Sequence, residues 1–330
     1  MNTAAAPVTI ALDGNGGDAG YQAIARAAEE VLATLPGVSL TVFGDPDMAA
    51  LLHRPHLSAR LRLVPCRQNI PQDAPISAVL RRYRHSSMYL ALCALRSREA
   101  QAVVSCGGTG PLVALSRHLL GTCGLRPALC ARLPAGPDSF TLMLDMGANA
   151  AVSSRDLLDF ALMGAAAASL TMQVERPRVS LLNVGTEEHK GSPLVREARD
   201  LITAAAVNYA GFIEARDLFS GCTEVIVTDG FSGNIALKAA EGVVTAYARG
   251  HGLRQCFARL AMPRWLLPWR HNGSLLLGVD GVVVKSHAAA PVHGIAAAVK
   301  AAAAFAAMEF HGRLRQSLES GGIRPHRRQI

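Results

Sequence analysis

Lysine is rare in this sequence, and its few copies stand where chemistry is possible. Of the 33 basic residues only four are lysines: Lys190, Lys238, Lys285 and Lys300. The first three lie in or beside glycine-containing loops or at the end of an apolar run, whereas Lys300 lies on an ordinary helix face. Lysine is a compact point charge and arginine a planar fork, so we interpret these three lysines as selected for the geometry of an anion site. The alternative is chance placement near loops that are common.

Four predicted strand ends run directly into glycine-containing loops. Glycines let backbone N–H groups converge, and the N-terminus of a following helix adds positive potential, so each loop could hold an anion. A tight strand-to-helix turn needs glycine for conformational reasons as well, but four such loops at one sheet edge favour a site. The loops are Asp13–Asp18, Ser105–Gly110, Asn183–Gly191 and Asp229–Asn234.

The motifs of these loops and the spacing of the cysteines argue against the usual cofactors. Gly14, Gly16 and Ala19 fit the dinucleotide pattern, but Asp13 and Asp18 place negative charge where a pyrophosphate would lie. A nicotinamide-dependent dehydrogenase therefore remains only as a rival hypothesis. No loop has the order of a nucleotide-binding P-loop, and the seven cysteines include no Cys-x-x-Cys pair, so we expect no cofactor and no metal.

Apolar runs that alternate with helical patterns predict the elements that carry these loops. Such alternation indicates an α/β fold with a mostly parallel, doubly wound sheet, in which ligands bind at the carboxyl ends of the strands. The expected strands are 8–13, 39–43, 102–105, 141–145, 178–184, 224–228 and 282–285. The expected helices begin near Gly20, Ile76, Gly110, Ser154, Pro193, Asn234 and Pro291.

The charge and hydropathy of the sequence indicate where in the cell the protein is expected. The net charge is +8, no signal peptide is evident, and no uncharged apolar run reaches the length of a membrane span, so we expect a cytoplasmic protein with peripheral membrane contact as an option. Residues 249–270 hold five arginines, no acid and both tryptophans. This amphipathic segment suits either a dimer partner or, through 253–269, a membrane surface. The basic end 313–330 is expected to be a frayed tail.

A series of short motifs occurs in order from about residue 8 to 290. They include Ala11–Asp13 with Gly16–Asp18, Ser86–Met88, Arg126–Ala128, Leu144–Asn149, Phe160–Gly164, Arg176–Val179, Leu181–Gly185, Lys190–Gly191, Asp229–Phe231 with Gly233–Asn234, Leu237–Lys238 and Lys285–His287. Together, these motifs resemble the bacterial phosphate acyltransferases of phospholipid synthesis.

The resemblance implies a fold similar to the isocitrate and isopropylmalate dehydrogenases and the phosphotransacetylases. It further implies one domain over residues 1–330 with two interleaved subdomains around a cleft, and a homodimer. The implied reaction moves a fatty acyl group from acyl-[acyl-carrier-protein] to inorganic phosphate. The acyl phosphate then passes to a membrane acyltransferase that uses glycerol 3-phosphate.

The resemblance and the loops together suggest roles for single residues. Lys190, Lys285 and the loop Ser105–Gly110 would hold phosphate, while Asn234 would bind the oxyanion or merely cap its helix. His287 would protonate the leaving thiolate or bond to backbone. Asn149 and Asp229 would touch substrate or only shape their loops. The full set of candidates is Lys190, Asn234 and Lys285 as catalytic residues, with Gly16, Gly17, Asp18, Ser105, Gly107, Thr109, Gly110, Asn149, Asp229, Gly233, Lys238 and His287 as binding residues.

Departures from the family pattern and the placement of arginine bear on partners. Gly108, Tyr83 and Phe212 replace the family's usual residues, which favours an alternative: a catalytically weak paralogue that serves as a scaffold for the carrier protein or a membrane enzyme. Between Arg54 and Arg98 there are nine arginines and one acid, Asp73. Acyl carrier proteins are acidic, so this stretch would attract one. Without interleaved aromatic residues, nucleic acid is not an expected partner.

Overall fold

The computed structural model describes residues 7–53, 59–248 and 263–320. The chain forms two compact units, Met1–Cys123 with Asn272–Arg313, and Gly124–His271 with Leu314–Ile330. The first unit is thus interrupted by the second. The helical part predicted within 249–270 lies outside the described residues; the rest of that segment holds two short 3-10 helices, η2 (Arg264–Leu266) and η3 (Pro268–His271).

The first unit is built on strands ordered β3-β2-β1-β4-β11-β10. All neighbours in this set are parallel except β10 and β11, because the chain returns to the unit through this hairpin. The strands are β1 (Val8–Asp13), β2 (Val38–Gly44), β3 (Leu61–Pro65), β4 (Ala102–Ser105), β10 (Ser274–Leu277) and β11 (Val282–Lys285).

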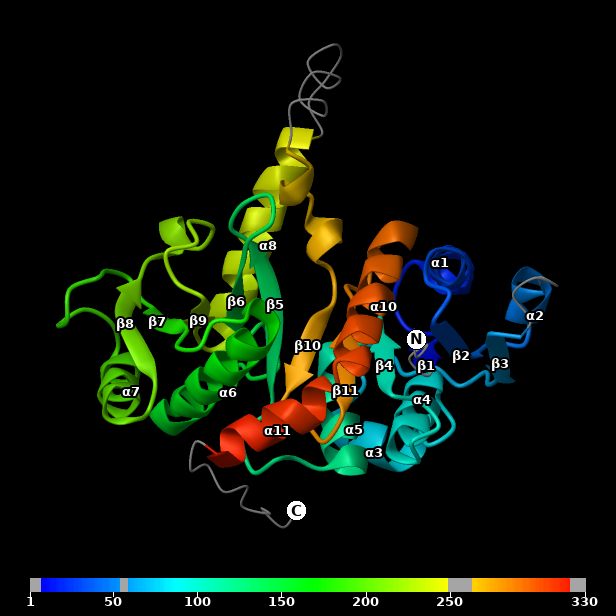
Figure 1. Cartoon of the computed structure of the whole chain (residues 1–330). Coiled ribbons are helices and arrows are strands. Elements are labelled where there is room, and N and C mark those ends of the chain that lie inside the picture. The colour runs from blue at the N-terminus through cyan, green and yellow to red at the C-terminus, as the bar shows by residue number, and fades with distance from the viewer. Residues whose placement is uncertain (1–6, 54–58, 249–262, 321–330) are drawn as a thin grey trace, which may run out of the picture. The chain divides into compact units, whose positions relative to one another are not determined.

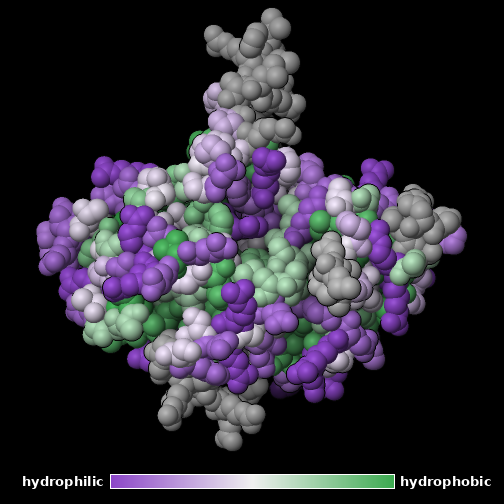
Figure 2. All heavy atoms as spheres, viewed as in Figure 1, coloured by the Kyte–Doolittle hydropathy of each residue, from purple (hydrophilic) through white to green (hydrophobic). Residues whose placement is uncertain are grey.

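Helices flank this set of strands. The alanine-rich α10 contacts β1, β4 and β11 and packs beside α1, as Figure 1 shows. Alanine at these buried positions lets the helix lie close to the sheet, and Figure 2 shows pale green apolar side chains over the outer face of α10. The helices of this part are α1 (Gly20–Thr34), α2 (Met48–Leu52), α3 (Ile76–Arg82), α4 (Ser87–Arg96), α5 (Thr109–Leu120) and α10 (Val292–Ala307). The last helix, α11 (Phe310–Ser320), begins in the first unit and continues in the second.

The second unit is built on strands ordered β5-β6-β9-β7-β8, of which only β5 and β6 are antiparallel. The long helix α6 covers β6, β9 and β7, and α7 packs on α6. The elements are β5 (Ala128–Pro134), β6 (Phe140–Leu144), α6 (Ser154–Met172), β7 (Arg178–Leu182), α7 (Pro193–Ala204), β8 (Asn208–Ile213), a 3-10 turn η1 (Ala215–Asp217), β9 (Val225–Val227) and α8 (Gly230–Ala248).

Two expectations about the helices are wrong. α8 begins at Gly230 rather than near Asn234, and the tail expected to be frayed from residue 313 is helical to Ser320 as part of α11. In α11 the side chains of Phe310, Leu314 and Leu318 are buried at a spacing of one helical turn, and this burial stabilises the helix. No single helix in the described ranges is long and apolar enough to cross a membrane.

Candidate functional site

In the first unit, a buried carboxyl group organises the ends of β1 and β4. Asp13 ends β1 and accepts hydrogen bonds from the Ser87 hydroxyl at 2.5 Å and the Ser105 hydroxyl at 2.6 Å. Ser105 Oγ in turn accepts the N–H of Gly107 at 3.0 Å. Burial raises the pKa of Asp13, and the hydrogen bonds from both serines oppose that rise. The chain of contacts fixes the loop after β4 against the loop after β1.

The two loops approach so closely that side chains are excluded. A Cβ on Gly16 would lie 2.5 Å from Asp13 Oδ2 and 2.7 Å from the backbone nitrogen of Gly107. Gly17 has φ +86°, a conformation that favours glycine. Gly108 then precedes α5, which begins at Thr109 and Gly110. Backbone amides and the positive end of a twelve-residue helix therefore gather at one place.

Lys285 and the loop after it lie at the same sheet edge. Lys285 ends β11 as the register partner of Ser105, and its ammonium group donates to the Ser286 carbonyl oxygen. The buried amide of Asn272 holds this loop, donating to Ser286 Oγ at 2.8 Å and accepting the His287 N–H at 3.1 Å. Asn272 is not evident as a site residue from the sequence, since a single asparagine before a strand carries no signal.

Cys106 is the only thiol among these loops in the described part of the chain. Its side chain is buried, and burial raises its pKa to about 11. At neutral pH it is a thiol, which is a poor nucleophile. In this environment Cys106 is a small buried residue that packs among the loops.

In the second unit, Asp145 shapes the loop after β6 as Asp13 does in the first. It is buried and accepts the N–H groups of Leu129 at 2.9 Å, Ala148 at 3.0 Å and Asn149 at 2.7 Å. Burial raises its pKa, while these hydrogen bonds oppose the rise. The carboxyl group is therefore a loop organiser with little capacity left for a ligand.

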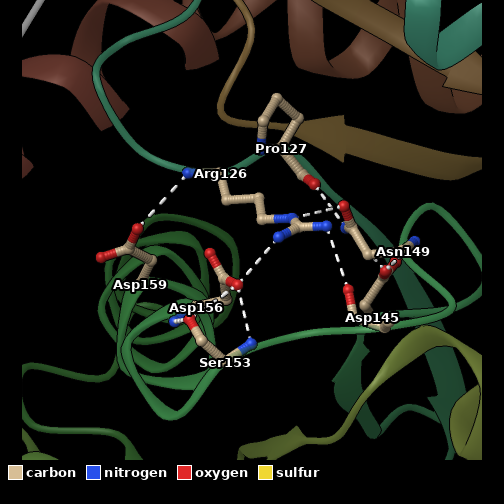
Figure 3. A network of polar contacts seen from close by, with 8 residues as sticks. Arg126, Pro127, Asp145, Asn149, Ser153, Asp156 and Asp159 are labelled. Atoms are coloured by element: carbon tan, nitrogen blue, oxygen red, sulfur yellow. Dashed lines mark hydrogen bonds and ion pairs between the residues drawn. The ribbon is translucent and has the colours of Figure 1, made fainter. Parts of the chain in front are cut away.

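Arg126 completes the loop, as Figure 3 shows. Its Nε donates to Asn149 Oδ1 at 2.7 Å, and its Nη1 forms an ion pair with Asp156 at 2.9 Å. The Asn149 Nδ2 group donates to Pro127 O and Asp145 Oδ2. Both amide donors and one acceptor of Asn149 are thus used inside the protein. This environment favours the loop-shaping alternative for Asn149 over substrate contact through its amide.

Asn234 lies beside this loop but does not cap a helix. It is exposed in the second turn of α8, and a Cβ on Gly147 would lie 3.6 Å from its side chain. Asp229 makes the local turn, accepting Ser232 N and Ser232 Oγ, both at 2.8 Å. With Asp229 at the helix start, the amide of Asn234 is available for another role.

The second unit holds two of the lysines, of which Lys238 follows Asn234 by one turn of α8. Lys190 is exposed in the loop after β7, and its backbone carbonyl oxygen accepts a hydrogen bond from the Asn183 side chain. The pKa of Glu187 is lowered, mainly by a backbone hydrogen bond and further by the charge of Lys190. Lys238, on α8, forms an ion pair with Glu241 at 2.7 Å. Lys285 belongs to the first unit and Lys190 to the second.

The candidate residues thus form two groups. The group at the carboxyl ends of β1, β4 and β11 comprises Gly16, Gly17, Asp18, Ser105, Gly107, Thr109, Gly110, Lys285 and His287. The group at the carboxyl ends of β6, β7 and β9 comprises Asn149, Lys190, Asp229, Gly233, Asn234 and Lys238. Among the described residues, no cluster of His, Cys, Asp and Glu could hold a metal ion.

Comparison with known proteins gives these loops a context. Residues 8–249 match the family model described as fatty acid synthesis protein. A phosphate acyltransferase of Nitrosococcus oceani is 40% identical over 315 residues, covering 89% of this chain and 92% of that protein. The fold matches a phosphotransacetylase from Streptococcus pyogenes with a TM-score of 0.61 at 15% identity, covering 94% of each chain. It also matches a putative 4-hydroxythreonine-4-phosphate dehydrogenase from Salmonella typhimurium, with a TM-score of 0.54 at 14% identity over 90% of this chain and 98% of that one.

Proposed function

This chain belongs to the phosphate acyltransferase family, and we propose that it transfers a fatty acyl group from acyl-[acyl-carrier-protein] to inorganic phosphate. The similarity to the Nitrosococcus oceani protein along most of both chains carries the proposal. The product, an acyl phosphate, serves phospholipid synthesis by acylating glycerol 3-phosphate through a membrane acyltransferase. The fold of the phosphotransacetylase is consistent with acyl transfer to phosphate.

The first unit suits the phosphate. Its loops present the N-terminus of α5, which begins at Thr109, with Lys285 on the neighbouring strand, and these groups together supply positive charge and hydrogen-bond donors. Phosphate needs no activation by a base because it is already an anionic nucleophile near neutral pH. The loops have to hold one phosphate oxygen against the thioester carbonyl carbon.

The reaction needs no covalent enzyme intermediate. A phosphate oxygen attacks the thioester carbon, so a C–O bond forms, the C–S bond breaks and the carrier thiolate leaves with its electron pair and then takes a proton. In the second unit, the exposed amide of Asn234 beside Gly147 is a candidate donor to the oxyanion that forms on the way. A protonated Cys106 agrees with a mechanism that uses no thiolate of the enzyme.

A hydroxylamine trap tests the activity. The purified chain is incubated with palmitoyl-[acyl-carrier-protein], phosphate and hydroxylamine, and we expect hydroxamate that depends on phosphate. Formation of none would reject the enzymatic function and leave the scaffold hypothesis. Lys285→Arg and Lys190→Arg keep the charge but change its shape, so we expect each to lower turnover by roughly tenfold or more. Lys300→Arg, at the ion pair of α10 with Glu30, is the control that should retain full turnover.

The same family relationship supports a proposal about the assembly. We propose a homodimer in the cytoplasm that contacts the membrane through residues 253–269 when it delivers the acyl phosphate. Large apolar side chains of α8 are more than half exposed: Phe231 by 62%, Ile235 by 52%, Val243 by 70% and Tyr247 by 57%. This apolar stripe is a surface that a second copy would cover.

A further inference from the structure

Four exposed arginines gather around the end of α3, and we call Arg67, Arg81, Arg82 and Arg84 the arginine patch. Arg81 and Arg82 form the last turn of α3, and Arg84 follows it. The side chain of Gln68 ties Arg67 to this turn: its Nε2 donates to Arg82 O at 3.1 Å and its Oε1 accepts His85 N at 3.0 Å. The four arginines therefore lie on adjoining segments of the chain, although the sequence separates Arg67 from the rest.

These charges are not neutralised within the described part of the chain. None of the four guanidinium groups forms an ion pair with a described carboxylate. Cations at a helix C-terminus are favourable, which explains how Arg81 and Arg82 can be tolerated together. What remains is a compact positive surface that a partner with negative charge would complement.

The arginine patch borders the anion loops of the first unit. The Gln68 carbonyl oxygen accepts the Ser87 N–H at 3.3 Å, and Ser87 donates to Asp13. Farther along the same segment, Gln72 Nε2 donates to Asp18 at 2.6 Å. Ile76, at the start of α3, is 42% exposed and lies 3.5 Å from where a Cβ on Gly110 would stand. An apolar contact therefore stands between the patch and the loops.

The other arginines of the same stretch are placed differently. Arg60 is used internally, because its guanidinium donates to the carbonyl oxygens of Leu32 at 2.7 Å and Leu35 at 2.9 Å near the end of α1. Arg96 stands at the far end of α4, where the chain turns toward the amino end of β4. The structure thus distinguishes the arginines of the patch from Arg60, which stabilises the fold, and from Arg96, which lies elsewhere. The number of arginines between Arg54 and Arg98 does not make this distinction.

We infer that the arginine patch is the docking surface for the acidic acyl carrier protein. The inference rests on the function proposed above, from which the carrier comes. Complementary charge would steer the carrier to this face, and its thioester arm would then start beside the loops of Asp13, Ser105 and Gly110. Ile76 adds an apolar contact that charge alone would not give.

Charge reversal tests the docking surface. The binding of fluorescently labelled palmitoyl-[acyl-carrier-protein] is measured by anisotropy, and its KM in the hydroxamate assay. We expect Arg81→Glu with Arg82→Glu to raise both Kd and KM for the carrier by about tenfold or more at low salt, with the KM for phosphate unchanged. In the unmodified chain, Kd should rise as salt is added.

Arg96→Glu is the matched control. It reverses one charge in the last turn of a helix, against two in the double variant, so its cost to the helix dipole is of the same kind but smaller, and it lies at the opposite end of α4. We expect carrier binding near that of the unmodified chain. An equal loss in both variants, no loss in the double variant, or binding of a DNA duplex but not of the carrier would each overturn the inference. The binding measurement needs no turnover, so an inactive chain that binds the carrier through the patch would reject the proposed function alone.

Discussion

At the scale of single residues, two buried aspartates do equivalent work in the two units. Asp13 joins the loops after β1 and β4, and Asp145 joins the loop after β6 to the start of β5. Neither carboxyl group needs to touch substrate to matter for binding. Each sets the direction of loop amides, because a buried acceptor allows only donors that point at it.

Replacing Asp13 tests this role. Asp13→Ala leaves the hydroxyls of Ser87 and Ser105 buried without their acceptor, so we expect the free energy of unfolding to fall by about 2–3 kcal/mol. Because the Ser105–Gly107 bond then loses its anchor, the KM for phosphate should rise more than the KM for the carrier. Urea unfolding and the hydroxamate assay measure the two effects. Asp73→Ala removes an exposed carboxyl group of the same unit and should change neither; an unchanged phosphate KM in Asp13→Ala would contradict the role.

At the scale of elements, the first turns of α8 show why glycine can lie inside a helix. A Cβ on Gly230 would lie 2.6 Å from Asn149 O, and one on Gly233 would overlap the backbone carbonyl oxygen of Asp145. The helix therefore packs on the loop after β6 with no room for a side chain. The low helix propensity of these glycines is outweighed by that packing.

A pair of glycine substitutions in α8 measures this contact. We expect Gly233→Ala to lower the free energy of unfolding by about 2–3 kcal/mol, since the methyl group meets rigid backbone. Gly242→Ala, in the same helix, meets nothing within 4 Å and should instead raise stability by about 0.5–1 kcal/mol. Chemical denaturation of both variants gives the comparison. Similar effects of the two changes would show that the contact with Asp145 is unimportant.

The same elements explain what the sequence could and could not predict. Dense β-branched runs identify β1, β4 and β11 at their observed bounds. β5 (ALCARLP) was missed because alanine, arginine and proline are weak strand formers, and β8 because Gly211 interrupts its pattern. The start of α8 was placed late because glycine normally argues against helix. The family and the α/β fold are confirmed by the comparisons, whereas the roles of Lys190, Asn234 and Lys285 stay predictions.

Contacts distant in sequence explain the site residues that were missed. Asn272 reaches the loop after β11 across fourteen residues, and Ser87 reaches Asp13 across seventy-four. The spacing of residues along the chain does not indicate which distant residues form such hydrogen bonds. The return of residues 272–313 to the first unit is equally invisible in an alternating pattern of strands and helices.

At the scale of the whole molecule, the apolar stripe of α8 links the chain to the proposed dimer. Val243 is 70% exposed, so Val243→Asp should leave the folded monomer nearly as stable as before. In a dimer that covers the stripe, each copy would bury an unpaired carboxylate at a cost of several kcal/mol. Light scattering after gel filtration at micromolar concentration should then give the mass of a monomer for the variant and of a dimer for the unmodified chain. Thr245→Asp, also exposed but on the opposite side of the helix, should remain dimeric; a dimeric Val243→Asp would place the interface elsewhere.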